Sequence, residues 1–369
     1  MEKKRIVIKI GSSSLTNACG EIDEEKFSDH IDALAALKNA GHEVIVVSSG
    51  AVAAGFRLLG YPARPVTLKG KQAAAAIGQG LLIRRYTEAL GQYGITPAQI
   101  LLTRQDFSKK SRYHNAYATL TELLLRGVMP IINENDTVSV AELTFGDNDM
   151  LSALVSGLVH AEQLIMYTDI NGLYSENPKF NPDAERFDYI DHITADLLRV
   201  AGGSGSKVGT GGMNSKLKAA HTALSLGVRV FIGSGAGKDK FIKVLEGSGD
   251  GTYIGGAGPA VTSRKQWIAL YSEITGKIYI DRGAAFALLK KGSSLLPAGV
   301  KKISGHFKKG DVVEVYGSQG LLGKGEVHYS AEEIETLLEN REGKLPAHSS
   351  TDVVIHRDKW VPTIKRELG

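Results

Sequence analysis

Residues 133–156 read NENDTVSVAELTFGDNDMLSALVS and bring two clusters of acids and amides into one short stretch. The apolar run VMPII just before it predicts a buried strand that ends at the first cluster, residues 133–136. A strand-like run, Val138–Phe145, separates it from the second cluster, residues 147–149, which opens a helix. Apolar residues recur in that helix at helical spacing: Met150, Leu151, Leu154 and Leu158. Such side chains can simply cap element ends, but two neighbouring clusters favour a polar pocket.

Strands and helices alternate along the chain from residue 5 to residue 232. Apolar runs of strand length occupy residues 5–10, 43–47, 95–102, 128–132, 163–167 and 228–232. Helical patterns lie between them, and Asp23 is the expected N-cap of the first helix, which ends near Ala40. This alternation predicts a mostly parallel sheet covered by helices on both faces, a three-layer α/β sandwich.

Polar and charged residues collect where the predicted strands end. Ligands of such folds bind beyond the carboxyl ends of the strands, and several candidates fall there: Lys9, Ser49, Asp136, Asp169 and the glycine-rich segment 202–216. The glycines free the backbone to pass close to a ligand. Lys9 has two interpretations at this point: an edge-strand lysine that reaches solvent, or a buried cation that meets an anion.

The pattern changes near residue 256, where glycines and a proline interrupt it. We predict a catalytic domain over residues 1–255, a linker over 256–275 and a small, mainly β domain over 276–369. A chain of 369 residues is long enough for two domains.

Composition and absent motifs narrow the function. A net charge of +4 is too small for a protein that wraps a polyanion, and the single cysteine, Cys19, excludes an intrachain disulfide. No apolar run is long enough for a membrane span, so we expect a cytoplasmic protein. The motifs GxxxxGK[ST], GxGxxG, HExxH and GxSxG are all missing. What remains is an anion-binding α/β enzyme of a less common type.

Six segments, in order, resemble the amino acid kinase family: IKIGSSSL, VSSGAVAAG, INENDTV, GDNDMLSALVS, TDINGLY and GTGGMNSKLKAA. The C-terminal GSSLLPAGV, FKKGDVVEV and VVIHRD resemble the PUA domain, an RNA-binding fold. Departures are small: Ser215 stands where the family usually has threonine, and Lys207 adds a charge to the glycine-rich segment. The resemblance covers residues 5 to about 358 and implies an amino acid kinase fold followed by a PUA domain.

Within that family, the combination of motifs resembles the enzymes that phosphorylate glutamate. It implies transfer of the ATP γ-phosphoryl group, with Mg²⁺, to the side-chain carboxylate of L-glutamate, the first step of proline biosynthesis. Proline is then the expected feedback inhibitor. Members of the family often assemble as dimers or tetramers, so the resemblance implies one of these assemblies. Two alternatives stay open: another acceptor of the family (aspartate, N-acetylglutamate, carbamate or UMP), or an RNA-binding protein that uses its PUA domain.

The family's motifs assign roles residue by residue. Lys9 and Lys216 are the expected catalytic cations, and Asp149 the carboxylate that holds them. Ser49, Asp136 and Asn148 are the expected glutamate contacts. The expected ATP site comprises Lys9, Thr168, Asp169, Thr210, Gly211, Gly212, Met213, Asn214, Ser215 and Lys216. No dedicated metal ligands are expected, since Mg²⁺ arrives with the nucleotide.

Overall fold

The computed structural model forms two compact units, Met1–Asp106 with Arg112–Ala260, and Phe107–Ser111 with Val261–Gly369. It describes residues 2–138, 148–176, 178, 181, 183–194, 197, 211–255, 268, 272–339 and 353–362. The expected strand Val138–Phe145 therefore lies almost wholly outside the described residues. The expected linker 256–275 does so for the most part, and the predicted domain boundaries stay predictions.

The first unit is built on an eight-stranded sheet in the order β3-β4-β2-β1-β5-β9-β10-β8. Its strands are β1 (Arg5–Ile10), β2 (Glu43–Ser48), β3 (Pro97–Leu102), β4 (Met129–Glu134), β5 (Gln163–Tyr167), β8 (Tyr189–Ile190), β9 (Arg229–Gly233) and β10 (Gly251–Ile254). The six strands from β3 to β9 run parallel, as predicted, whereas β10 pairs antiparallel with β9. The carboxyl ends of six strands therefore share one edge of the sheet.

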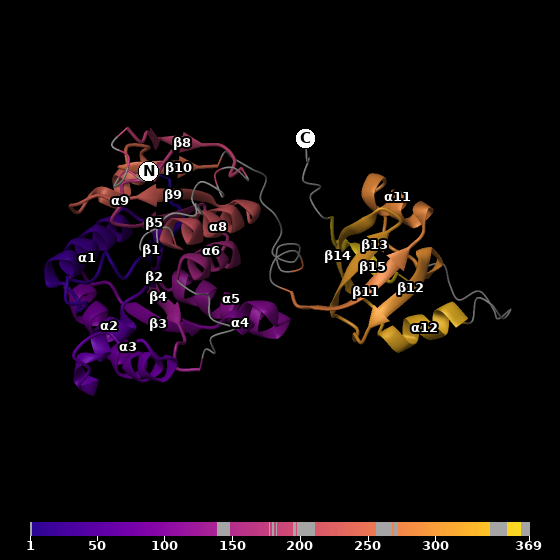
Figure 1. Cartoon of the computed structure of the whole chain (residues 1–369), viewed down its shortest axis with the longest axis horizontal. Coiled ribbons are helices and arrows are strands. Elements are labelled where there is room, and N and C mark those ends of the chain that lie inside the picture. Colours follow the sequence, from indigo (N-terminus) through magenta and orange to yellow (C-terminus); the bar gives the residue numbers. More distant parts are fainter. Residues whose placement is uncertain are drawn as a thin grey trace. The chain divides into compact units, whose positions relative to one another are not determined.

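Helices cover both faces of this sheet, as the alternation predicted (Figure 1). They are α1 (Glu24–Asn39), α2 (Ala51–Gly55), α3 (Leu68–Gly91), α4 (Arg104–Ser108), α5 (Lys110–Leu125), α6 (Asn148–Leu158), α8 (Gly211–Ser225) and α9 (Lys240–Leu245), with a 3₁₀ turn at Arg57–Leu59. Figure 1 shows α1, α3 and α9 on one face and α5, α6 and α8 on the other. The Asp23 carboxylate accepts from the Lys26 N–H, which confirms Asp23 as the N-cap of α1.

Strand β1 lies in the middle of the sheet. Lys9 is in register with Val47 of β2 on one side and with Met166 of β5 on the other. The edge-strand interpretation of Lys9 is therefore wrong, and only 5% of the residue is exposed. Because β1 has a strand on each side, the Lys9 side chain cannot reach solvent past an open sheet edge. Its buried ammonium therefore needs an anionic partner inside the protein.

Helix α6 is buried along nearly its whole length. Leu151 and Leu158 are fully buried, and two serines, Ser152 and Ser156, are buried beside them. The Ser152 hydroxyl donates to the Asp149 carbonyl and the Ser156 hydroxyl to the Ser152 carbonyl, each at 2.6 Å, so neither is left without a partner. This packing fixes the first turn of α6, and with it Asn148 and Asp149.

Helices α2 and α3 cross at a pair of glycines. A Cβ atom built on Gly78 would lie 1.7 Å from the Ala51 carbonyl oxygen, and one built on Gly55 would lie 2.0 Å from the Ala74 carbonyl oxygen. The two backbones can approach this closely only because neither glycine carries a side chain. The contact holds α2, which follows directly from Ser49 and Gly50.

The second unit is mainly β, as predicted. Its five-stranded sheet has the order β12-β11-β13-β14-β15, formed by Val300–Gly305, Ile274–Ile280, Val312–Gly317, Gly320–Val327 and Ile355–Pro362. Strand β11 runs parallel to β13, and the other pairs are antiparallel. Helices α11 (Arg282–Lys290) and α12 (Ala331–Glu339) complete the unit, and its core includes Val313, Val315 and Trp360.

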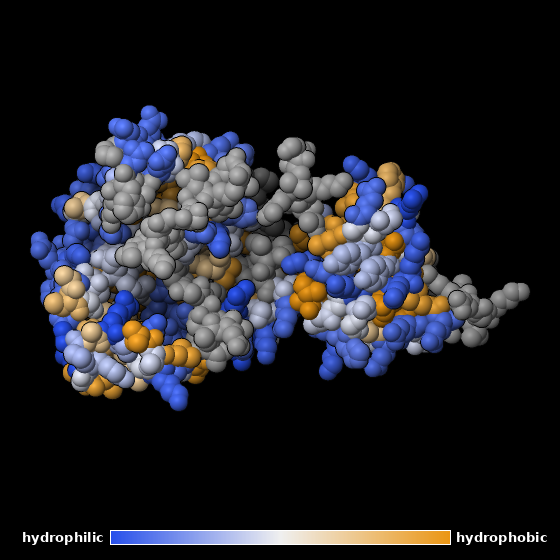
Figure 2. All heavy atoms as spheres, in the orientation of Figure 1, coloured by the Kyte–Doolittle hydropathy of each residue, from blue (hydrophilic) through white to orange (hydrophobic). Residues whose placement is uncertain are grey.

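Among the described residues on the face drawn in Figure 2, hydrophilic side chains predominate on each unit and hydrophobic ones form smaller patches. Among the helices that the structure describes, none combines the length and the apolar character that crossing a bilayer requires.

The glycine crossing predicts a large difference between two substitutions on one helix. Gly78→Ala forces a methyl group into the α2 backbone and should lower the free energy of unfolding by roughly 1–3 kcal/mol or more. Gly80→Ala, two residues further along α3 and with open space around its Cβ, should be neutral or raise it by about 0.5–1 kcal/mol. Urea unfolding of both variants checks this, and equal effects would contradict the close crossing.

Candidate active site

A single buried carboxylate joins two lysines that are far apart in the sequence. Asp149 Oδ1 lies 2.6 Å from Lys9 Nζ, and Asp149 Oδ2 lies 3.0 Å from Lys216 Nζ. The Asp149 side chain is fully buried, and the lysine side chains are 6% and 12% exposed. The structure thus brings together the two expected catalytic cations, one on each oxygen of the same carboxylate.

The charges of this group stabilise one another. Burial opposes ionisation of Asp149, but the Lys9 and Lys216 ammonium groups outweigh it and hold the pKa of Asp149 below its ordinary value. Asp149 is therefore ionised at neutral pH. Two cations and one anion leave a net positive charge in a site with little solvent, which suits a strongly anionic ligand.

Three elements deliver these side chains. Lys9 lies near the end of β1, Asp149 in the first turn of α6, and Lys216 in the second turn of α8. Gly11 leaves room for the Lys9 ammonium, since a Cβ there would lie 3.2 Å from Lys9 Nζ. Ser215, where the family usually has threonine, still reaches the carboxylate, because its hydroxyl donates to Asp149 Oδ2 at 3.2 Å.

Asn148, the first residue of α6, ties together the ends of two strands. Its side-chain amide donates to Ser49 Oγ at 3.0 Å and to Asn133 Oδ1 at 2.8 Å. Asn133 in turn donates to Gln79 Oε1 of α3 at 2.8 Å. Two of the expected glutamate contacts, Ser49 and Asn148, are thus neighbours. Gln79 was not predicted, because nothing in its local sequence distinguishes it from a surface helix residue.

Asp136 lies two residues beyond β4 and is half-buried. Burial, and next the Glu134 carboxylate, raise the pKa of Asp136 to about 6, while Arg64 opposes the rise. Burial and the neighbouring carboxylate destabilise the ionised form of Asp136. A cation placed beside it therefore stabilises that form more than it would stabilise an exposed carboxylate.

The expected nucleotide residues lie on the other side of β1. Thr168 and Asp169 follow β5, where the Thr168 N–H donates to the Gly233 carbonyl at 2.9 Å and its hydroxyl to Asp169 Oδ1 at 3.1 Å. The remaining ones lie in the first turns of α8: Gly211, Gly212, Met213, Asn214, Ser215 and Lys216. Thr210 lies outside the described residues. The first N–H groups of an α-helix have no acceptor within the helix, so the start of α8 suits phosphate oxygens.

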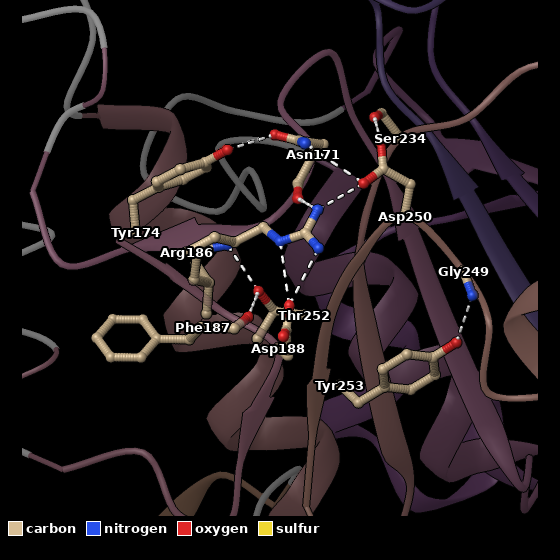
Figure 3. Close-up of polar contacts among 11 residues, drawn as sticks. Asn171, Tyr174, Arg186, Phe187, Asp188, Ser234, Gly249, Asp250, Thr252 and Tyr253 are labelled. Carbon is tan, nitrogen blue, oxygen red and sulfur yellow. Dashed lines mark hydrogen bonds and ion pairs between the residues drawn. The ribbon is translucent and has the colours of Figure 1, made fainter. Parts of the chain in front are cut away.

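A polar network, shown in Figure 3, supports the turn that follows Asp169. Arg186 donates to Asp250 Oδ1 at 2.5 Å and to the Asn171 carbonyl at 3.3 Å. The Thr252 hydroxyl accepts from the Leu173 N–H at 2.8 Å. Asp250 lies 64 positions from Arg186, and Thr252 lies 79 positions from Leu173, so no local sequence pattern indicates these two contacts.

The arrangement can bind two anions next to each other. Ser49, Asn148 and Asp136 lie at the ends of β2 and β4, whereas Thr168 and α8 lie beside β5 and β9. Lys9 and Lys216 stand between the two sets, joined by Asp149. Within the described residues, no three His, Cys, Asp or Glu side chains gather as metal ligands.

The lowered pKa of Asp149 predicts an acid-dependent loss of stability. The stabilisation is complete above the unfolded-state pKa, about 3.9, and is lost as pH falls through the lower folded-state value. Asp149→Asn should remove this contribution, leaving a less steep acid dependence and roughly 3–5 kcal/mol less stability at neutral pH. Urea unfolding from neutral to acid pH measures both. Asp191→Asn, an exposed aspartate, is the control, and an unchanged acid slope in Asp149→Asn would contradict the ion triad.

Comparison with known proteins shows which family the sequence belongs to. The sequence profile of the Amino acid kinase family matches residues 4–234, and that of the PUA domain matches residues 276–347. "Glutamate 5-kinase 1" from Bacillus licheniformis is 64% identical over 98% of this chain and 99% of that protein. "Glutamate 5-kinase 1" from Bacillus subtilis is 61% identical over the same shares.

A solved UMP kinase from Bacillus anthracis superposes with a TM-score of 0.47 and 13% identity over 68% of this chain and 96% of that chain. The assignment rests instead on the sequence matches, which extend over most of the first unit and, in the bacilli, over nearly the whole chain. The chain belongs to the amino acid kinase family.

Proposed function

We propose that the protein transfers the γ-phosphoryl group of ATP to the side-chain carboxylate of L-glutamate, which gives L-glutamyl 5-phosphate and ADP, the first step of proline biosynthesis. The observation that carries phosphoryl transfer is the pair of lysine ammonium groups on the buried Asp149 carboxylate. The choice of glutamate is supported by the glutamate 5-kinases that are 56% to 64% identical to the chain. Aspartate, N-acetylglutamate, carbamate and UMP are not favoured.

The chemistry requires little proton transfer and strong electrostatics. The glutamate side chain is already ionised at neutral pH, so the nucleophile needs no general base. The barrier lies in bringing this anion to a triphosphate and in stabilising charge on the migrating group. Lys9 and Lys216 supply that stabilisation. An ammonium about 4 Å from an anion contributes roughly 4 kcal/mol at an effective dielectric near 20, or about a thousandfold in rate.

Asp149 is a positioning residue in this mechanism. Its two oxygens hold the ammonium groups of Lys9 and Lys216 before substrates arrive. Without the Asp149 carboxylate, the two flexible lysine side chains would repel each other and lose their orientation. Preorganised charge costs no reorganisation during the reaction, which is why it lowers the barrier.

Glutamate is recognised through its charges. Asp136, ionised, pairs with the substrate α-ammonium, and Ser49 and Asn148 donate to the carboxylates. The raised pKa of Asp136 is expected for a carboxylate whose cationic partner is the substrate. The Asn148 amide already bridges Ser49 and Asn133, so the donors on this side of the site are held in place.

ATP occupies the side formed by Thr168, Asp169 and the start of α8. The backbone N–H groups of Gly211 to Asn214 meet the phosphates, while Lys216 reaches the γ-phosphate from the same helix. Bound Mg²⁺ would neutralise phosphate charge. An Mg²⁺ ion that arrives with the nucleotide is held mainly by phosphate oxygens and water.

Three further parts of the proposal rest on the family resemblance. Proline, the end product, inhibits the enzyme, and the protein assembles as a dimer or tetramer. The PUA domain, matched over residues 276–347, is a candidate RNA-binding unit. Analytical ultracentrifugation and an RNA-binding assay on the full chain test the last two.

An acceptor panel tests the function itself. With ATP and Mg²⁺, glutamate should give the acyl phosphate, trapped as the hydroxamate, faster than aspartate, N-acetylglutamate, carbamate or UMP release ADP. Addition of proline should slow the reaction. Fastest turnover with any other acceptor would refute the proposal.

Removal of one ammonium tests its part in catalysis. Lys216→Ala should lower kcat by roughly 10²- to 10⁴-fold, with little change in the melting temperature. Lys218→Ala on the same helix removes an exposed lysine and should leave kcat unchanged. If Lys216→Ala turned over at the wild-type rate, Lys216 would have no place in the mechanism.

The assignment of Asp136 predicts a pH profile. An ammonium binds only the ionised carboxylate, so kcat/KM for glutamate should rise with pH through about 6, the pKa of Asp136, and then level off. Asp136→Asn should remove this rise and increase KM for glutamate roughly 10- to 100-fold, since a hydrogen bond to a charged group contributes about 1.5–3 kcal/mol. Steady-state kinetics over this pH range measures both, and a loss confined to kcat would contradict the role.

A further inference from the structure

A second buried cation lies outside the site just described. Lys240, the first residue of α9, has a side chain that is 2% exposed and forms an ion pair with Asp29 of α1. Its ammonium lies 3.0 Å from His30 Nδ1 and 4.9 Å from the centre of the Tyr167 ring. No step of the proposed mechanism uses Lys240, yet burying an ammonium is expensive.

The contacts of Lys240 fix the tautomer of His30. An ammonium only donates, so Nδ1 of His30 must accept from it, and the ring proton must sit on Nε2. Nε2 then donates to the Ser14 carbonyl at 3.0 Å. Burial and the nearby ammonium lower the pKa of His30 to about 4, so the ring is neutral at neutral pH. The two hydrogen bonds of the His30 ring thus link the Lys240 ammonium to the Ser14 carbonyl.

Ser14 belongs to the turn that follows Lys9. Its N–H donates to the Gly11 carbonyl at 3.2 Å, and the Leu15 N–H donates to the Ser12 carbonyl at 3.0 Å. Gly11 is the residue that faces the Lys9 ammonium. The hydrogen bond from His30 therefore holds the turn that begins at Gly11, beside the Lys9 ammonium.

A second branch of the cluster reaches the end of β5. The Tyr167 ring stacks edge-on against His30, with ring centres 4.8 Å apart, and its hydroxyl donates to the Gly235 carbonyl. The next residue is Thr168, in the expected nucleotide site. Asp29 also accepts from the Gly237 N–H at 2.8 Å. One buried cation thus connects the turn after β1, the end of β5 and the loop after β9.

These three strands are adjacent in the sheet, and Lys9, Thr168 and Asp169 of the proposed nucleotide site lie on them or directly after them, whereas Ser49 and Asp136 follow β2 and β4. An apolar side chain would fill the position of Lys240 at lower cost, since buried ion pairs often stabilise less than hydrophobic packing. A charge at this position can instead hold neighbouring polar groups in one arrangement, which packing alone does not do. What it holds is the geometry of one half of the site.

We propose that Lys240 and His30 are positioning residues that order the turn 11–15 and the end of β5 for the nucleotide, and so set the affinity for ATP but not for glutamate. This inference rests on the proposed function, because ATP is its ligand. It gives the Asp29–His30–Lys240 cluster a role in the binding of one substrate rather than in overall folding.

Four variants separate these roles. His30→Leu removes both hydrogen bonds of the ring and leaves the Asp29–Lys240 pair in place, whereas His30→Gln can supply a donor and an acceptor again. Lys240→Met removes the charge, and Lys243→Met removes an exposed lysine from the same helix as the matched control. For each we measure KM for ATP and for glutamate, kcat, the Kd of MgADP by calorimetry without acceptor, and the melting temperature.

His30→Leu and Lys240→Met should raise KM for ATP and the Kd of MgADP by about tenfold or more, the scale of a displaced binding group. KM for glutamate should not change, His30→Gln should restore nucleotide binding, and Lys243→Met should match the wild type. If Lys240→Met does not fold, the His30→Leu and His30→Gln variants by themselves decide whether the proposal holds. Equal losses for both substrates, or a lower melting temperature with unchanged nucleotide binding, overturn the proposal.

The calorimetry keeps this test distinct from that of the function. If the wild type phosphorylates no glutamate but binds MgADP, and His30→Leu weakens that binding, the proposed function fails and the positioning role stands. If the wild type phosphorylates glutamate and His30→Leu binds MgADP normally, the positioning role fails alone.

Discussion

The structure of the site depends on the contact of one carboxylate with two ammonium groups. Lys9 and Lys216 would repel each other if they shared a pocket without an anion, and neither could stay buried. Asp149 removes both problems by giving one oxygen to each lysine. That requirement explains why α6 is buried along its length and why its first turn faces the strand ends: a small displacement of Asp149 would release two cations at once.

The central strand β1 separates the two groups of residues that form the site. The strands on one side carry the polar groups that suit a small amino acid, and those on the other lead to the start of α8, which suits phosphate. Lys9 lies on the boundary, and Lys216 meets it there through Asp149. Each substrate can then be held by its own half of the sheet, while both meet the same pair of charges.

Buried charge is used twice in this unit, with different surroundings. In the active site, one anion holds two cations and leaves a positive charge for the ligand. Around Lys240, one cation is matched by Asp29 and by the accepting nitrogen of a neutral histidine. The first arrangement attracts an anionic substrate. The second is neutralised within the protein, so its effect is to hold the backbone in place.

The sequence by itself determined the local elements, the parallel α/β character and the residues gathered at strand ends, because periodicity reports which face of an element is buried. The family motifs added the expected roles of Lys9, Asp149 and Lys216. Only the tertiary structure decided that β1 is central and Lys9 buried, that Gln79 supports Asn133 through a side-chain hydrogen bond, and that Lys240 reaches Ser14 through His30. The physical reason is that strand order and side-chain partners depend on contacts between distant segments, which no local pattern encodes.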